Sequence, residues 1–194
     1  MTLLTLVRHG QTDWNLQGRI QGSTDIPLND TGRQQAAAVA ERLAAVPFDH
    51  VYTSPLSRAV ETAEIVAGAL ALPAPLVAVG MREHEFGEAE GLLWDQYVDR
   101  FHGRRDDVPG AESVRQLTDR ALASLERIDL AARRRSAPRE ESVLVATHGG
   151  VIRALLEHAS GGTLPAAGES LANGSVHRFA MDGGGLRLLD TVIA

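Results

Sequence analysis

Two histidines directly follow short apolar runs, and each precedes a glycine. The run Leu3–Val7 leads into Arg8-His9-Gly10, and the run 142–147 leads into His148-Gly149-Gly150. Apolar, partly β-branched runs of this length predict buried strands. Ligands of open α/β sheets bind beyond the carboxyl ends of the strands, so both histidines are expected at one edge of a sheet. The glycines would let the backbone approach a ligand closely.

Two further residues are placed to reach the same edge. Arg58 follows the predicted strand 50–54 by one helical turn, and Glu83 follows the predicted strand 76–79. Two arginines and one histidine can bind a dianion, for which a phosphoryl group is the natural occupant. A second histidine could then attack phosphorus, while a carboxylic acid exchanges a proton with the leaving alcohol. These residue types therefore predict phosphoryl-transfer chemistry.

The elements that must position these residues alternate between strands and helices. Strands are predicted over 3–7, 50–54, 76–79, 142–147, 176–180 and 186–192, and helices over 34–45, 55–72, 92–101, 113–133 and 151–158. Capping-box spacing places helix starts at Thr31 and Ser113, and Ser54 is expected to cap the helix that Pro55 begins. This alternation predicts an α/β fold, a three-layer sandwich with a mostly parallel central sheet flanked by helices.

Composition limits the classes of function. The 194 residues, 44% apolar and 23% charged, predict one globular domain over 1–194. The net charge of −6 argues against nucleic acid or an anionic membrane as partner. The chain has no cysteine and no lysine, which excludes thiolate nucleophiles, disulfides and Schiff-base chemistry. No export signal or membrane span is recognised, so a cytoplasmic location is the default expectation.

Several motifs together resemble the histidine phosphatase superfamily in its phosphoglycerate-mutase-like branch. The motifs are Leu6–Asn15, Thr53–Ala59, Arg82–Gly91, Pro109–Ser113, Thr147–Gly150 and Asn173–Ser175. An Arg-His-Gly motif alone would be weak, but ordered motifs over nearly the whole chain are specific. One departure is Ala89, where the family often has tryptophan.

The resemblance implies a role for each candidate residue. His9 would be phosphorylated, and Glu83 would be the proton donor and acceptor. Phosphate and substrate contacts would come from Arg8, Arg58, His148, Asn15, Gln21, Gly22 and Gly149. A cap of helix and loop from about 84 to 112 is expected over the site, and no metal or organic cofactor is expected.

The same residues can serve a phosphatase, a phosphoglycerate mutase or a non-catalytic phosphate binder. The interval between the third motif and the His-Gly motif is short, which favours a phosphatase acting on a small-molecule phosphate ester. A non-catalytic binder would be expected to lose the nucleophile or the acid, and both are present. Arg104 and Arg105 could bind a second anionic group of the substrate. A homodimer that forms through the sheet edge is possible from the sequence.

Overall fold

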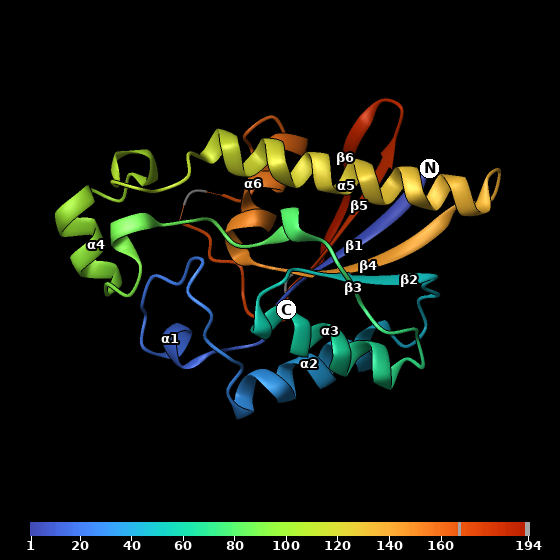
Figure 1. Ribbon diagram of the computed structural model, residues 1–194, viewed down its shortest axis with the longest axis horizontal. Helices are drawn as coiled ribbons and strands as arrows, with labels where there is room; N and C mark the ends of the chain where they lie inside the picture. Colours follow the sequence, from blue (N-terminus) through green and yellow to red (C-terminus); the bar gives the residue numbers. More distant parts are fainter. Residues whose placement is uncertain (167, 193–194) are drawn as a thin grey trace.

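The computed structural model of the protein describes residues 1–166 and 168–192. Within them lies one six-stranded sheet with the order β3-β2-β4-β1-β5-β6 (Figure 1). The strands are β1 (Thr2–Arg8), β2 (His50–Thr53), β3 (Leu76–Val77), β4 (Glu141–Thr147), β5 (Val176–Asp182) and β6 (Gly185–Val192). β3, β2, β4 and β1 pair in parallel, whereas β5 pairs antiparallel with both β1 and β6. The sheet is therefore mostly parallel.

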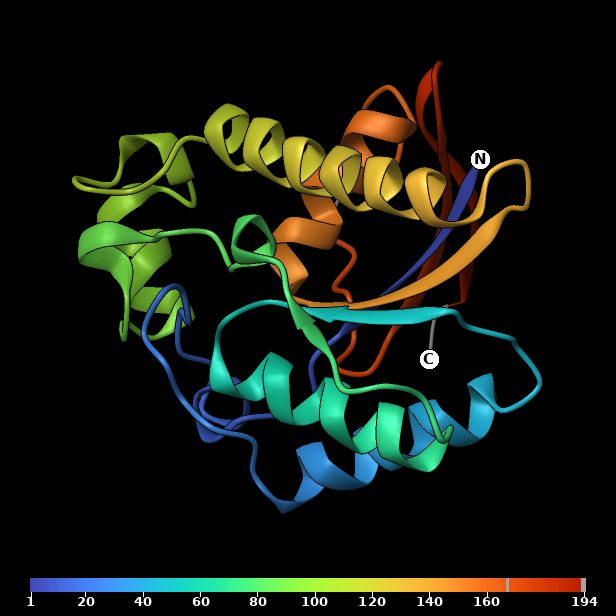
Figure 2. The same ribbon diagram turned by 45° about the vertical axis from the view of Figure 1, so that its right-hand side comes forward.

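Helices cover both faces of this sheet (Figures 1 and 2). α2 (Asp30–Leu43) and α3 (Ser57–Ala69) lie on one face, and α5 (Val114–Ser136) and α6 (Gly149–Ala159) lie on the other. The short α1 (Asp13–Leu16) and α4 (Trp94–Phe101) lie beyond the end of the sheet toward which β1 runs. The predicted three-layer α/β architecture is confirmed. None of the helices in the described part of the chain is long and apolar enough to cross a membrane.

The central strand β1 is buried on both faces. Leu4 and Leu6 pack in the apolar cluster under α5 and α6, whereas Val7 packs in the cluster under α2 and α3. Successive side chains of a strand point to opposite faces, which explains the near-continuous apolar run. Burial of each such side chain stabilises the fold by about 1.5–3 kcal/mol. This anchoring holds the end of β1, where Arg8 and His9 lie.

Two helix starts differ from the sequence prediction. The cap of α2 is Asn29, whose side chain accepts from the N–H of Gly32 at 2.9 Å, and not Thr31. α3 begins only at Ser57, after a residue that offers no side-chain cap. The predicted cap Ser54 lies outside this helix, and its hydroxyl contacts a histidine of the site described below. The predicted capping box of Ser113 is confirmed.

The remaining boundaries shift by a few residues. β3 is shorter than predicted, because residues 79–81 form a 3-10 turn, η1. α6 begins two residues earlier than predicted, at Gly149, and α5 continues to Ser136. Between β3 and α5, the segment that carries α4 and the 3-10 turns η2 (Gly87–Ala89) and η3 (Arg105–Asp107) has its own apolar cluster, centred on Phe86, Tyr97 and Phe101.

Candidate active site

The carboxyl ends of β1 and β4 bring the two predicted histidines together. The strands pair with Arg8 opposite Thr147, so the next residues, His9 and His148, are neighbours. The N–H of His9 donates to the carbonyl of Thr147 at 2.9 Å. Both side chains are buried, and their ring centroids lie 5.1 Å apart in an edge-to-face arrangement. Adjacent parallel strands thus place two imidazoles at one site.

The His9 imidazole has one occupied and one available nitrogen. Nδ1 lies 2.6 Å from the carbonyl oxygen of Gly10. A carbonyl only accepts, so Nδ1 carries the proton and Nε2 keeps its lone pair. Burial, with the nearby guanidinium groups of Arg58 and Arg8, holds the pKa of His9 well below its usual range. The ring is therefore neutral at pH 7, the form in which a histidine is nucleophilic.

Arg58 is a fully buried cation held by backbone carbonyls. Its Nη1 donates to the carbonyl of Thr24 at 3.0 Å, and its Nη2 donates to that of Gly22 at 2.8 Å. Its Nε donates to Nδ1 of His148 at 3.3 Å. Burial lowers the pKa of Arg58 to about 10, which leaves the side chain charged at neutral pH. The positive charge of this guanidinium is thus fixed in place beside both histidines.

Two predicted substrate contacts, Gln21 and Gly22, hold Arg58. The Gln21 amide is satisfied when its nitrogen donates to Thr12 Oγ1 at 2.7 Å and its oxygen accepts from Arg58 Nη1 at 3.0 Å. The carbonyl of Gly22 accepts from Arg58, and a Cβ at position 22 would lie 2.2 Å from Oε1 of Glu90. The close approach of Glu90 therefore requires glycine here.

His148 has hydrogen-bond partners on both ring nitrogens. Because Nδ1 accepts from Arg58, Nε2 carries the proton and faces Oγ of Ser54 at 2.7 Å. Burial and the charge of Arg58 hold the pKa of His148 well below its usual range. Ser54 also accepts from the N–H of Leu56 at 3.3 Å. Sequence reasoning missed this contact, because the serine before a proline is typical of a helix cap.

Glu83 receives two backbone hydrogen bonds. Its Oε1 accepts from the N–H of His84 at 2.8 Å, and its Oε2 accepts from the N–H of Gly150 at 3.1 Å. Gly150 lies in the first turn of α6, where the backbone N–H groups have no partner within the helix. A Cβ on Gly150 would lie 2.4 Å from Oε1 of Glu83. The second glycine of the His-Gly-Gly motif therefore makes room for the carboxyl group.

Asn15 and Arg8 both present free donors. Oδ1 of Asn15 accepts from the N–H of Thr12 and from Nδ2 of Asn173, each at 3.2 Å, so its own amide nitrogen is left to donate. Asn173 also donates to the carbonyl of His9 at 3.0 Å. Nε of Arg8 is buried, with no hydrogen-bond partner in the described part of the chain.

A cavity of about 780 Å³ lies over these groups. The predicted residues that line it are Arg8, His9, Asn15, Gln21, Glu83 and Gly149. Arg58, His148 and Gly22 lie behind the lining, and a Cβ on Gly149 would lie 3.2 Å from Nε of Arg8. No group of three or more His, Asp or Glu side chains within residues 1–166 and 168–192 is arranged to hold a metal ion.

Comparison with known protein families agrees with this geometry. The family model for "Histidine phosphatase superfamily (branch 1)" matches residues 4–193, almost the entire chain. The chain belongs to the histidine phosphatase superfamily. The resemblance stated from the sequence motifs is therefore confirmed, and so is the fold class that it implies.

Relatives of this histidine phosphatase superfamily member have phosphatase and mutase names. An uncharacterized phosphatase PhoE of Bacillus subtilis is 41% identical over 164 residues, 84% of this chain and 79% of the relative. A mycobacterial glucosyl-3-phosphoglycerate phosphatase is similar in structure, with a TM-score of 0.83 and 26% identity, over 100% of this chain and 99% of its own. A phosphoglycerate mutase from Bacillus anthracis has a TM-score of 0.83 and 25% identity, over 98% and 92%. These relatives support a phosphatase or mutase activity.

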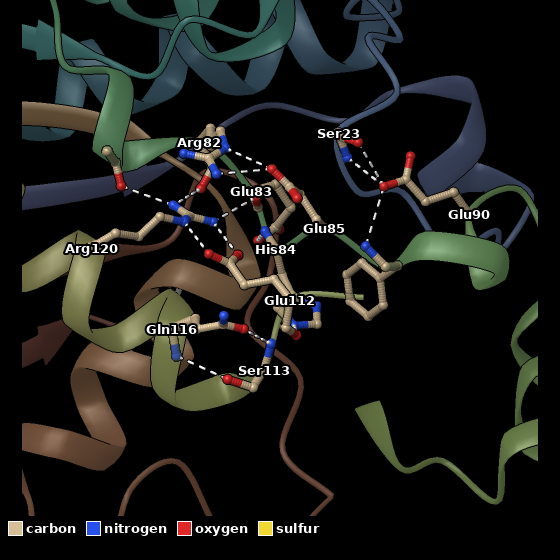
Figure 3. Close-up of polar contacts among 12 residues, drawn as sticks. Ser23, Arg82, Glu83, His84, Glu85, Glu90, Glu112, Ser113, Gln116 and Arg120 are labelled. Atoms are coloured by element: carbon tan, nitrogen blue, oxygen red, sulfur yellow. Dashed lines mark hydrogen bonds and ion pairs between the residues drawn. The ribbon is translucent and has the colours of Figure 1, made fainter. Parts of the chain in front are cut away.

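An ion pair that the sequence analysis did not single out holds the backbone around Glu83 (Figure 3). Arg120 of α5 binds Glu112 through two hydrogen bonds, of 2.6 and 2.7 Å. The same guanidinium donates to the carbonyls of Gly80, Arg82 and Glu83 at 2.7–2.9 Å. Five contacts from one side chain thus fix the loop that carries the carboxyl group. Periodicity could not reveal this contact, because Arg120 is one of many charged residues in a long helix.

We expect the Arg120→Met substitution to lower kcat for alkyl phosphates about 10- to 100-fold and to leave KM within threefold of the wild-type value. The loss should be smaller for aryl phosphates, because their leaving groups depend less on a proton donor, the role that the family resemblance implies for Glu83. A merely structural role of Arg120 would lower the rates for alkyl and aryl phosphates equally.

The double variant Arg120→Met with Glu112→Gln avoids leaving the buried carboxylate of Glu112 unpaired. Arg115→Met is the control, because Arg115 lies on the same helix and is 91% exposed.

Proposed function

We propose that the protein is a phosphomonoesterase that hydrolyses small-molecule phosphate esters without a metal, through a phosphohistidine on Nε2 of His9. The observation that carries this proposal is the tautomer of His9. The Gly10 carbonyl occupies Nδ1, which leaves the Nε2 lone pair on a neutral ring that lines the cavity. The cavity volume of about 780 Å³ suits a small molecule.

In the first step, Nε2 of His9 attacks phosphorus and the bond from phosphorus to the ester oxygen breaks. Glu83, as the carboxylic acid, gives its proton to the departing alkoxide, which leaves as the alcohol. Arg8 and Asn15 have free donors at the cavity, and Arg58 adds a fixed positive charge behind it. These groups stabilise the charge that develops on the phosphoryl oxygens.

In the second step, the Glu83 carboxylate takes a proton from water as the water oxygen attacks phosphorus. The bond from phosphorus to Nε2 breaks, inorganic phosphate leaves, and His9 returns to its neutral form. A mutase would instead transfer the phosphoryl group to another hydroxyl. The short interval between Glu83 and His148 supports the phosphatase, as do the phosphatase names among the relatives.

The test is to trap the intermediate. The protein is mixed with 4-nitrophenyl [³²P]phosphate for milliseconds and quenched in base, in which a phosphohistidine survives. A phosphoserine ester, in contrast, would survive in acid. We expect label that is stable in base, lost in acid, and located on His9 by peptide mapping. Turnover with no such label would overturn the covalent mechanism. A chelator should leave the rate unchanged, and strong inhibition by it would contradict the metal-free step.

A further inference from the structure

The sequence motif Arg82–Gly91 contains a carboxylate that has no role in the reaction described above. Glu90 directly follows the 3-10 turn η2, is half-buried, and does not line the cavity over His9. Its side chain points toward Ser23, in the loop between α1 and α2 (Figure 3). A carboxylate in this position can affect the reaction only through the groups that it holds.

Glu90 binds this loop through both of its carboxylate oxygens. Oε1 accepts from the N–H and the hydroxyl of Ser23 at 2.8 and 2.9 Å, and from the N–H of Phe86 at 3.2 Å. Oε2 accepts from the N–H of Thr24 at 2.9 Å and from its hydroxyl. Burial alone would raise the pKa of Glu90, but the hydrogen bonds from Thr24 and Ser23 lower it. The group is therefore ionised at neutral pH.

The carbonyls of the same loop hold Arg58. Its Nη2 donates to the carbonyl of Gly22 at 2.8 Å, and its Nη1 donates to that of Thr24 at 3.0 Å. The Gly22 carbonyl and the Ser23 N–H belong to one planar trans peptide unit, in which they point in opposite directions. Because Glu90 accepts from this N–H, it also orients the carbonyl that accepts from Arg58. One peptide unit thus links a carboxylate to a guanidinium, and both charges polarise it in the same sense.

A second carboxylate ties this loop to α3. Oδ1 of Asp25 accepts from the N–H and the hydroxyl of Ser57, the first residue of α3, at 2.9 and 2.8 Å. Burial lowers the pKa of Arg58, and the charges of Glu83, Asp25 and Glu90 oppose this shift. The two carboxylates therefore fix the loop and also favour the charged form of the guanidinium that the loop holds.

We propose that Glu90 is a positioning residue for phosphoryl transfer, which fixes Arg58 beside the two histidines through the peptide units of residues 22–24. The segment between β3 and α5 thereby contributes to the chemical step, in addition to lining the cavity. This inference rests on the proposed function, in which Arg58 stabilises the charge on the phosphoryl oxygens. Glycine at position 22 belongs to the same arrangement, because a Cβ there would lie 2.2 Å from Oε1 of Glu90.

The test begins with the Glu90→Ala variant, assayed with one alkyl and one aryl phosphate. We expect kcat to fall about tenfold for both esters, with KM within about threefold, because Arg58 acts on the phosphoryl group and not on the leaving alcohol. Glu90→Gln keeps one carbonyl oxygen as acceptor and should lower kcat only about threefold. Glu88→Gln is the matched control and should keep the wild-type kcat, because Glu88 lies in the same turn and binds Arg100 instead, at 2.6 Å.

A double-mutant cycle with Arg58→Met separates positioning of Arg58 from general damage to the fold. In the Arg58→Met background, Glu90→Ala should change kcat for the aryl phosphate by less than about twofold, because the group that Glu90 positions is absent. A full tenfold loss in this background would overturn the proposal, as would an unchanged kcat in Glu90→Ala alone. If a thermal melt shows that Glu90→Ala does not fold, Glu90→Gln takes its place in the cycle.

Calorimetry with orthovanadate gives the same cycle without turnover, because vanadate can bind as a five-coordinate analogue of the transition state. We expect Glu90→Ala to weaken vanadate binding about tenfold in the wild-type background and less than about twofold in Arg58→Met. If the wild type forms no phosphohistidine and this pattern of binding still holds, the proposed function fails while the role of Glu90 stands. A phosphohistidine on the wild type, with kcat and vanadate binding that Glu90→Ala leaves unchanged, has the opposite meaning.

Discussion

Replacing His9 by alanine is expected to lower kcat/KM for every phosphate ester by at least about 10⁴-fold and to abolish the base-stable phosphoenzyme. The reason is that, of the two buried imidazoles at the site, only that of His9 keeps a ring nitrogen with a free lone pair. His148 uses Nδ1 to accept from Arg58 and Nε2 to contact Ser54. The measurements are steady-state turnover of 4-nitrophenyl phosphate and the acid-labile label after a rapid quench.

The control for this variant is His158→Ala, which removes an exposed histidine of α6 and should retain full activity. The pH dependence gives a second check. Because the pKa of His9 is held well below its usual range, the ring stays neutral as the pH falls through 6.5. The rate of phosphoenzyme formation by His9 should therefore not halve near pH 6.5, as it would for an unperturbed histidine. Residual turnover above a hundredth of the wild-type rate in His9→Ala would contradict this role of His9.

Replacing Glu83 by glutamine is expected to act differently on two classes of ester. For an alkyl phosphate, whose alkoxide leaves only with a proton, kcat should fall about 10²- to 10⁴-fold. For an aryl phosphate with a good leaving group, His9 should still become phosphorylated, but water would attack the phosphoenzyme slowly. A stopped-flow burst of nitrophenol close to one equivalent per site, followed by slow turnover, is the expected result.

Glu85→Gln is the matched control, because Glu85 lies in the same loop and its carboxylate binds Arg82 at 2.9 Å, away from the cavity lining. In Glu83→Gln one of the N–H donors of His84 and Gly150 loses its acceptor, so a thermal melt should accompany the kinetics. Equal losses for alkyl and aryl phosphates in a well-folded variant would argue against proton transfer by Glu83.

Local sequence patterns predicted a helix or strand correctly where residues within a few positions of one another determine it. The apolar runs that became β1 and β4 are buried on both faces, so their composition alone identified them. Ser113 capped α5 as expected, since the capping box involves residues within one turn. Ser54 did not cap α3, which begins three residues later, and its hydroxyl contacts a histidine 94 residues away. The preference of a single serine for helix caps therefore did not determine where α3 begins.

By itself the sequence determined the family, the layer architecture and the residue types at the strand ends. Those features depend on motifs and on patterns only a few residues long. The tertiary structure alone decided which nitrogen of His9 is free, how Arg120 holds the Glu83 loop, and that Arg105 and Arg153 line the same cavity as His9. Each of these depends on contacts between segments far apart in the chain. No local pattern encodes such a contact, because its free energy appears only when the sheet brings the segments together.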